Sequence, residues 1–252
     1  MRSFVLSLAL LTACSANPPE PPPFFEGLGD YHHAITANNL QAQAYFDQGL
    51  RLTYAFNHEE AIRSYEYALE LDPGCAMCWW GIALAAGPNI NSAMDSVEGA
   101  LAWDAIQYAV ALAPDVSAAE QEYINALARR YGPAPLGDRA ERDSAYASAM
   151  SRVAGRALGD DDAQVLYTDA LMNLAPWNYW NPDGTPRTAT EVLFSALERV
   201  VERSPDHAGA CHLYIHTVEK VDAERAVPCA ERLPDLMPSA GHIVHMPAHI
   251  FV

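Results

Sequence analysis

Residues 45–73 read YFDQGLRLTYAFNHEEAIRSYEYALELDP, and this stretch decides the fold of the chain. Small and aromatic residues recur along it at helical spacing, namely Tyr45, Gly49, Ala61, Tyr65 and Ala68. Small residues let two helices approach closely, and Pro73 ends a helix because proline lacks a backbone donor. The stretch therefore predicts two packed helices joined by a turn at Asn57-His58-Glu59, where Asn57 and Glu59 are suited to capping.

These spacings resemble those of the tetratricopeptide repeat, a helix–turn–helix unit of about 34 residues. Four stretches are also similar to those of bacterial exported tetratricopeptide-repeat proteins: residues 45–50, 54–59, 87–91 and 241–247. The resemblance covers nearly all of residues 31–252. It implies an all-α fold, a right-handed α-solenoid of about five and a half helix pairs.

The later helix pairs follow from the same spacing. The second runs from Ala76 to Pro114 with a loop extension at 87–91, and the others are expected at 117–131 and 138–158, at 162–174 and 188–203, and at 208–221 and 223–237. A further first helix opens near Gly241. The chain stops on apolar Ile250-Phe251-Val252 where a solenoid needs a polar cap, which indicates a domain truncated at its C-terminus.

The first residues predict export. Arg2 and the apolar stretch Phe4–Leu11 precede Leu11-Thr12-Ala13-Cys14, which resembles the cleavage and lipidation site of a bacterial lipoprotein. Residues 1–13 are then a signal peptide, Cys14 carries the lipid, and residues 14–30 form a proline-rich tether. By resemblance to Gram-negative lipoproteins, Ser15 favours the periplasmic side of the outer membrane, so we expect a lipid-anchored protein of the cell envelope.

The charge balance limits the partners. The chain carries 32 acidic and 15 basic residues, a formal net charge of -17, which would repel a phosphate backbone and argues against nucleic acid as a partner. Basic peptides and metal cations are better candidates. No internal apolar run is long enough to span a bilayer, so a membrane is expected as a partner only through the lipid anchor.

Four further cysteines would lie in an oxidising space if the chain is exported. Cys75 and Cys78 form a CxxC that Trp79 follows, which argues against covalent haem attachment and leaves open a local disulfide, a metal pair or two packed thiols. Cys211 and Cys229 are candidates for a bridge between the two helices of one repeat.

Histidines gather on two neighbouring first helices. In tetratricopeptide repeats, positions 2, 5, 9 and 12 of each first helix line the concave groove. The resemblance places two sets of residues there: His212, His216 and Glu219 on one helix, and His242, His245 and His249 on the next. Helical periodicity independently puts each set on one face. Pro247 is expected to kink or delay the second helix, which would change the direction of its imidazoles.

We interpret these six residues as a candidate metal site. Imidazole-rich sites with little carboxylate suit zinc or copper, and three ligands with an open position make a reactive centre. Glu219 is a candidate base or orienting group, and Met246 a candidate soft ligand, although such a methionine is usually packing. No catalytic residue can be assigned. Two functions stay open: a scaffold whose concave groove holds a peptide or protein ligand beside a metal site, or a copper- or zinc-dependent enzyme acting on a small molecule in the periplasm.

The remaining histidines and one aromatic stretch give weaker indications of function. His32 and His33 are expected in an exposed loop, with folding back into the groove as the alternative, and His207 is a candidate outer partner of the site. The aromatic stretch 176–184 is expected to plug the stack or to cap the groove.

Overall fold

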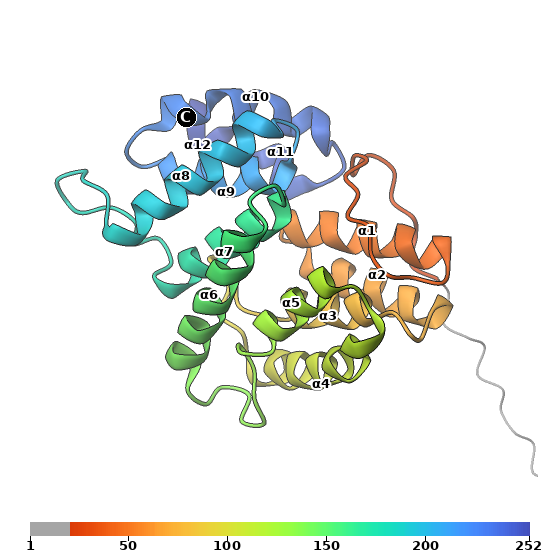
Figure 1. The fold of residues 1–252 in the computed structure, drawn as a ribbon. Helices are drawn as coiled ribbons and strands as arrows, with labels where there is room; N and C mark the ends of the chain where they lie inside the picture. Colours follow the sequence, from red (N-terminus) through yellow and green to blue (C-terminus); the bar gives the residue numbers. More distant parts are fainter. Residues whose placement is uncertain (1–20) are drawn as a thin grey trace, which may run out of the picture.

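The computed structural model describes residues 21–252, and over this range the protein is entirely helical (Figure 1). The predicted signal peptide, Cys14 and the tether up to residue 20 lie outside the described residues. In chain order the elements are α1 (Leu40–Tyr54), α2 (His58–Leu71), α3 (Ala76–Ala85), α4 (Ser96–Leu112), the 3-10 helix η1 (Ala113–Asp115), α5 (Ala118–Leu127), α6 (Arg139–Arg156), α7 (Asp161–Leu174), α8 (Thr188–Arg203), α9 (Ala208–Val218), the 3-10 helix η2 (Ala223–Ala226), α10 (Val227–Leu236), α11 (Gly241–His245) and α12 (Ala248–Phe251).

The helices lie close to the expected ranges, with two departures. His58 is the first residue of α2 instead of a turn residue, and the Asn57 side chain makes no capping hydrogen bond. The last predicted helix is split into α11 and α12, because Pro247 interrupts the backbone hydrogen bonds at that point. Elsewhere the sequence supplies its own caps: Asp95 and Glu98 form a capping box at the start of α4, which satisfies backbone donors that a helix end would otherwise leave free.

Tyr65 holds the first three helices together. Its ring, fully buried on α2, lies between Gly49 of α1 and Gly81 of α3. A Cβ atom at either glycine would come within 2.5 Å of that ring, so only glycine allows this approach. The sequence singled out Gly49 and Tyr65 as helix-packing residues, and the structure adds Gly81 as the second glycine against the Tyr65 ring.

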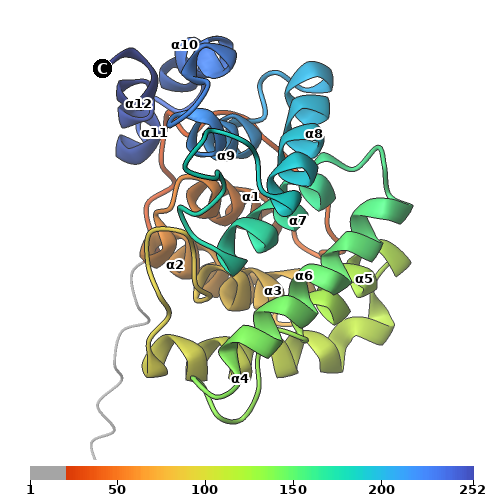
Figure 2. The same ribbon diagram turned by 90° about the vertical axis from the view of Figure 1, so that its left-hand side faces the viewer.

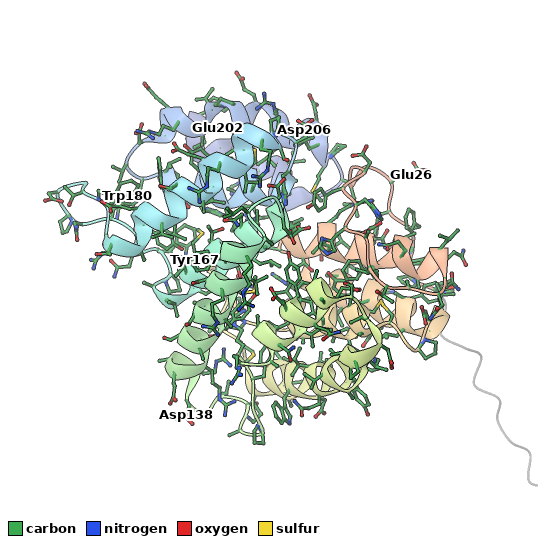
Figure 3. The ribbon with its side chains drawn as sticks, viewed as in Figure 1. Glu26, Asp138, Tyr167, Trp180, Glu202 and Asp206 are labelled. Carbon is green, nitrogen blue, oxygen red and sulfur yellow. A yellow bond between two sulfur atoms is a disulfide. The ribbon has the colours of Figure 1, made fainter. Side chains whose placement is uncertain are left out.

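Consecutive helices pack against one another from α1 to α10, and the path then curves back on itself. As a result α9 contacts α1 as well as α7 and α8, although some 150 residues separate α1 from α9 (Figures 1 and 2). Gly209 of α9 makes this closure possible, because a Cβ atom there would lie 2.6 Å from the Tyr54 ring. Side chains fill the space between the helices (Figure 3).

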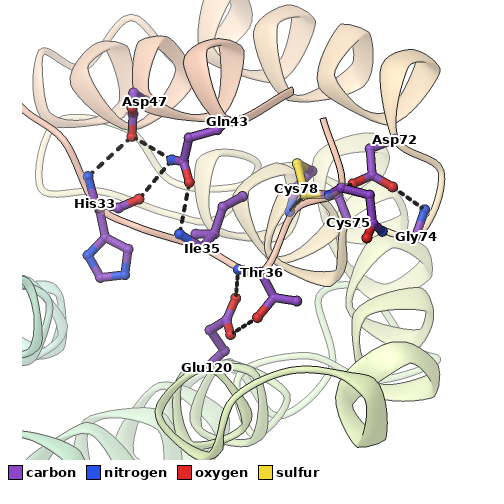
Figure 4. Close-up of a disulfide and its surroundings, with 11 residues drawn as sticks. His33, Ile35, Thr36, Gln43, Asp47, Asp72, Gly74, Cys75, Cys78 and Glu120 are labelled. Carbon is purple, nitrogen blue, oxygen red and sulfur yellow. Dashed lines mark hydrogen bonds between the residues drawn. A yellow bond between two sulfur atoms is a disulfide. The ribbon is translucent and has the colours of Figure 1, made fainter. Parts of the chain in front are cut away.

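The segment before α1 folds back across the first helices of three pairs. Gln43 and Asp47 of α1 accept hydrogen bonds from the backbone of Ile35 and His33, and Glu120 of α5 accepts from Thr36 (Figure 4). The expectation of an exposed loop was therefore wrong for His33, because acidic and amide side chains satisfy the extended backbone. His32 binds Asp47 at 2.7 Å and keeps 55% of its side chain exposed.

Asp162 of α7 anchors this segment from the inside. Its buried carboxylate accepts hydrogen bonds from Tyr31 at 2.8 Å, from His33 Nδ1 at 2.5 Å and from the Tyr54 hydroxyl, and it faces His207 at 3.4 Å. Burial raises the pKa of this carboxyl, but hydrogen bonds and charge from His207 and His33 outweigh burial and leave the pKa below its ordinary value. His207 thus belongs to this anchor. Its Nδ1 also accepts from the Ala210 amide, which caps α9.

Two disulfides cross-link the chain. Cys75 and Cys78 pair at the start of α3, which settles the three alternatives for that CxxC (Figure 4). Cys211 of α9 pairs with Cys229 of α10, the bridge between these two helices for which the sequence offered both cysteines as candidates. None of the helices from residue 21 onward combines the length and the apolar character that crossing a bilayer requires.

Candidate metal centre

Three of the predicted ligands come together beside the contact between α1 and α9. His212 and His216 of α9 and His242 of α11 each offer a ring nitrogen within 4.8 Å of the others, and their ring centroids lie 4.8–5.9 Å apart. We call these residues the inner triad. His212 and His216 are buried, and His242 is partly buried.

The tautomer of His212 is set by the α1 backbone. Its Nδ1 lies 2.7 Å from the Tyr54 carbonyl oxygen, which can only accept a hydrogen bond, so Nδ1 carries the proton. Nε2 therefore presents a lone pair, and it lies 2.9 Å from Nε2 of His242. This arrangement, with one ring nitrogen donating to a carbonyl and the other left free, is typical of metal-ligating histidines.

His216 presents the clearest sign of a missing partner. Its Nδ1 lies 3.3 Å from Glu219, while its buried Nε2 has no hydrogen-bond partner among the described residues. A buried polar atom without a partner is costly, so it calls for an explanation such as a bound ion. This orphaned nitrogen fits the donor set of a zinc or copper site, which is built from imidazole nitrogens.

Two imidazoles of the triad, those of His212 and His242, have pKa values below the ordinary value of histidine. Burial lowers the pKa of His212 well below its ordinary value, and neighbouring His216 and His242 lower it further. Burial also lowers the pKa of His242 to about 4. Because a metal ion binds only the unprotonated ring nitrogen, these shifts keep ligands available in mildly acidic water.

Glu219 is placed as an orienting group. Its Oε2 lies 2.7 Å from Nδ1 of His249 and 3.3 Å from Nδ1 of His216, so one carboxylate faces ring nitrogens from α9 and α12. His216, Glu219 and His249 form a second group whose ligand atoms lie within 4.8 Å of one another. Since both Nδ1 atoms can donate to Glu219, its position favours fixing their tautomers over acting as a base.

His245 does not join the single cluster of histidine side chains that the sequence predicted. It belongs to neither group, it is exposed, and its Nε2 lies 3.0 Å from Nε2 of His249. His245 is the last residue of α11 and faces His249 of α12, so not all five histidines point at one place. Met246 is fully buried in the hydrophobic core, which makes it a packing residue.

Two aromatic residues that the sequence analysis did not assign to the site enclose the triad. Phe56 contacts His212 with ring centroids 4.4 Å apart and stacks on His242 at 5.4 Å, and Trp177 sets its edge against His216 at 5.1 Å. Both have a positive φ, 54° and 62°, which is costly for bulky residues and is concentrated at functional sites. The stretch 176–184 is anchored beside the site by indole hydrogen bonds from Trp177 to the Ile90 carbonyl and from Trp180 to the Thr217 carbonyl.

His58 is a further neighbour that the sequence did not connect with the site. It stacks on Phe56, and its Nε2 accepts a hydrogen bond from Asn89. Burial lowers the pKa of His58 to about 4. Comparison with known proteins adds nothing to this geometry, because no family model and no curated protein matches the chain.

Proposed function

We propose that this protein binds one zinc or copper ion through the Nε2 atoms of the inner triad. The observation that carries the proposal is the buried, unpartnered Nε2 of His216 beside the oriented Nε2 of His212. Two imidazoles on a tetrahedral zinc have nitrogens roughly 3.3 Å apart, given bonds of about 2.0–2.1 Å. The 2.9 Å between His212 and His242 would therefore widen by a few tenths of an ångström.

We infer that the triad sits in a right-handed solenoid of the tetratricopeptide type. The succession of packed helices and the fit of Tyr65 between Gly49 and Gly81 support this assignment. The proposed location is the periplasmic side of the outer membrane, with Cys14 lipidated. Support comes from the leader-like first residues and from the two disulfides, which are typical of oxidising compartments.

The proposed role is a binding scaffold for the metal. The inner triad supplies three ligands to a tetrahedral ion, and Phe56 and Trp177 cover it, which favours holding an ion over turnover of a substrate. The alternative, a metal-dependent enzyme acting on a small molecule, is favoured by the fourth coordination position that three ligands leave. A bound zinc would there act as a Lewis acid or lower the pKa of a water molecule.

A peptide ligand in the concave groove would compete with the N-terminal segment of this same chain. Residues 22–39 cross α1, α5 and α7. Side chains of α1 and α5 accept hydrogen bonds from their backbone, and Asp162 of α7 accepts from the side chains of Tyr31 and His33. A partner peptide would have to displace this segment or use another surface. Extended backbone already lies across these helices, which supports keeping a protein-binding scaffold as part of the proposal.

The test is a titration of metal-free protein, produced without a histidine tag, with Zn²⁺ and with Cu²⁺. Replacing His212, His216 or His242 by Gln should weaken binding of the first ion by about 100-fold or more, since loss of an outer partner alone typically costs 10–100-fold. His32→Gln, which removes an exposed histidine bound to Asp47, is the matched control and should bind normally. Equal affinity in all four variants would refute the triad.

A further inference from the structure

His245 and His249 form a second arrangement of facing nitrogens, which we call the outer pair. Their Nε2 atoms lie 3.0 Å apart across the break between α11 and α12, with ring centroids at 4.8 Å. Glu219 lies 2.7 Å from His249 Nδ1, so this nitrogen is suited to donate and Nε2 to accept. His249 therefore presents a lone pair towards His245, as His212 does towards His242.

Exposure decreases stepwise from the outer pair to the inner triad. His245 is exposed, the His249 side chain is 28% exposed, and the side chain of His216 is 1% exposed. The rings follow one another at nearly constant spacing: 5.2 Å between the centroids of His249 and His216, and 4.9 Å between those of His216 and His212.

These centroid distances are close to the distance expected between two imidazoles that bind the same metal ion. Two imidazoles bound to one tetrahedral zinc have centroids roughly 5 Å apart, given the nitrogen bond lengths of such sites. An ion leaving His249 would therefore contact His216 before it lost its previous ligand. Passing from ligand to ligand avoids the cost of moving a bare cation into a buried, low-dielectric site.

We propose that the outer pair is a second, weaker zinc or copper site through which ions reach and leave the inner triad. The proposal rests on metal binding by the triad and adds the route. The exposed position of His245 makes capture from water possible, while the single carboxylate of Glu219 provides the attraction for a cation. The competing explanation of the 3.0 Å distance is a hydrogen bond without an ion, in which His245 Nε2 donates to His249 Nε2.

The test measures rates as well as affinity. Zn²⁺ is mixed with metal-free protein in a stopped-flow instrument, and release is followed with a zinc-sensitive chelating dye in excess. His245→Gln is the main variant, because His245 does not contact Glu219. A change at His249 would also disturb Glu219, which faces His216. His32→Gln, remote from the cluster, is the control.

In the His245→Gln variant we expect loading and release both to slow by about tenfold, with the equilibrium affinity for the first ion unchanged within about twofold. Rates equal to those of the unaltered protein would overturn the proposal and leave the inner triad standing. Faster release with weaker affinity would also overturn it, because His245 would then be a ligand of the triad's own ion. Absence of zinc binding in the unaltered protein would refute the proposed function itself.

Discussion

The Nδ1 atom of His212 lies 2.7 Å from the carbonyl oxygen of Tyr54, a residue 158 positions earlier in the chain. This contact joins the last turn of α1 to α9. The packing of these two helices therefore fixes the orientation of the His212 ring. The Tyr54 hydroxyl meanwhile binds Asp162 on α7. One tyrosine thus connects the proposed metal site with the anchor of the N-terminal segment.

Gly209→Ala tests this link. The added methyl group would lie 2.6 Å from the Tyr54 ring, so α9 must move away from α1. We expect a loss of about 1–3 kcal/mol in the free energy of unfolding, the usual cost of overpacking, together with weaker zinc binding. Gly155→Ala on α6 is the matched control: nothing lies within 4 Å of its added methyl group, and a helical alanine should be neutral or slightly stabilising. Equal stability of the two variants would contradict the close contact.

The stability of the metal-free protein should fall in acid, partly because of His212. Burial lowers the pKa of this histidine in the folded state, whereas the unfolded chain titrates near 6.5. Its contribution is therefore complete above about pH 6.5 and is lost below it, by roughly 1.4 kcal/mol per pH unit. Urea unfolding of the protein and of His212→Gln at pH 7, 6 and 5 should show the difference between them shrinking towards pH 5. A constant difference would show that His212 is not buried as a neutral ring.

Asp162→Asn should destabilise the protein strongly. The substitution removes the negative charge of a buried carboxylate that accepts from Tyr31, Tyr54 and His33, and breaking such a group typically costs about 3–5 kcal/mol. Asp161→Asn is the control, since its partner Arg203 is partly exposed and a surface pair contributes only about 0–1 kcal/mol. Urea unfolding compares the two. A cost for Asp162→Asn no larger than the control's would mean that the anchor of residues 31–33 contributes nothing.

The positions of the helices followed from the sequence because their determinants are local. Glycine, alanine, tyrosine and proline mark close helix contacts and helix ends, and each helix depends on its own apolar periodicity and on the packing of its neighbours. The gathering of His212, His216 and His242 was predictable for the same reason, since it depends on two adjacent first helices. The exposure of His245 was harder to predict, because α11 contains only five residues and ends at His245.

The surroundings of the site depend on contacts between distant parts of the chain. Phe56 reaches the triad because α1 and α9 meet, and Trp177 reaches it because the segment after α7 lies against α9. The periodicity of the sequence predicts neither contact. The contacts of His33 could not be predicted from the sequence either, since they involve Asp47 and Asp162 from two separate helices. One usable signal was present: an unusual density of aromatic residues at 176–180 and next to His58.

The most direct test of the metal site is an anomalous difference map from crystals of the zinc-loaded protein, recorded at the zinc absorption edge. The account predicts one strong peak about 2.0–2.1 Å from the Nε2 atoms of His212, His216 and His242. A map without a peak among these three rings, or with its only peak between Glu219 and His249, would contradict it.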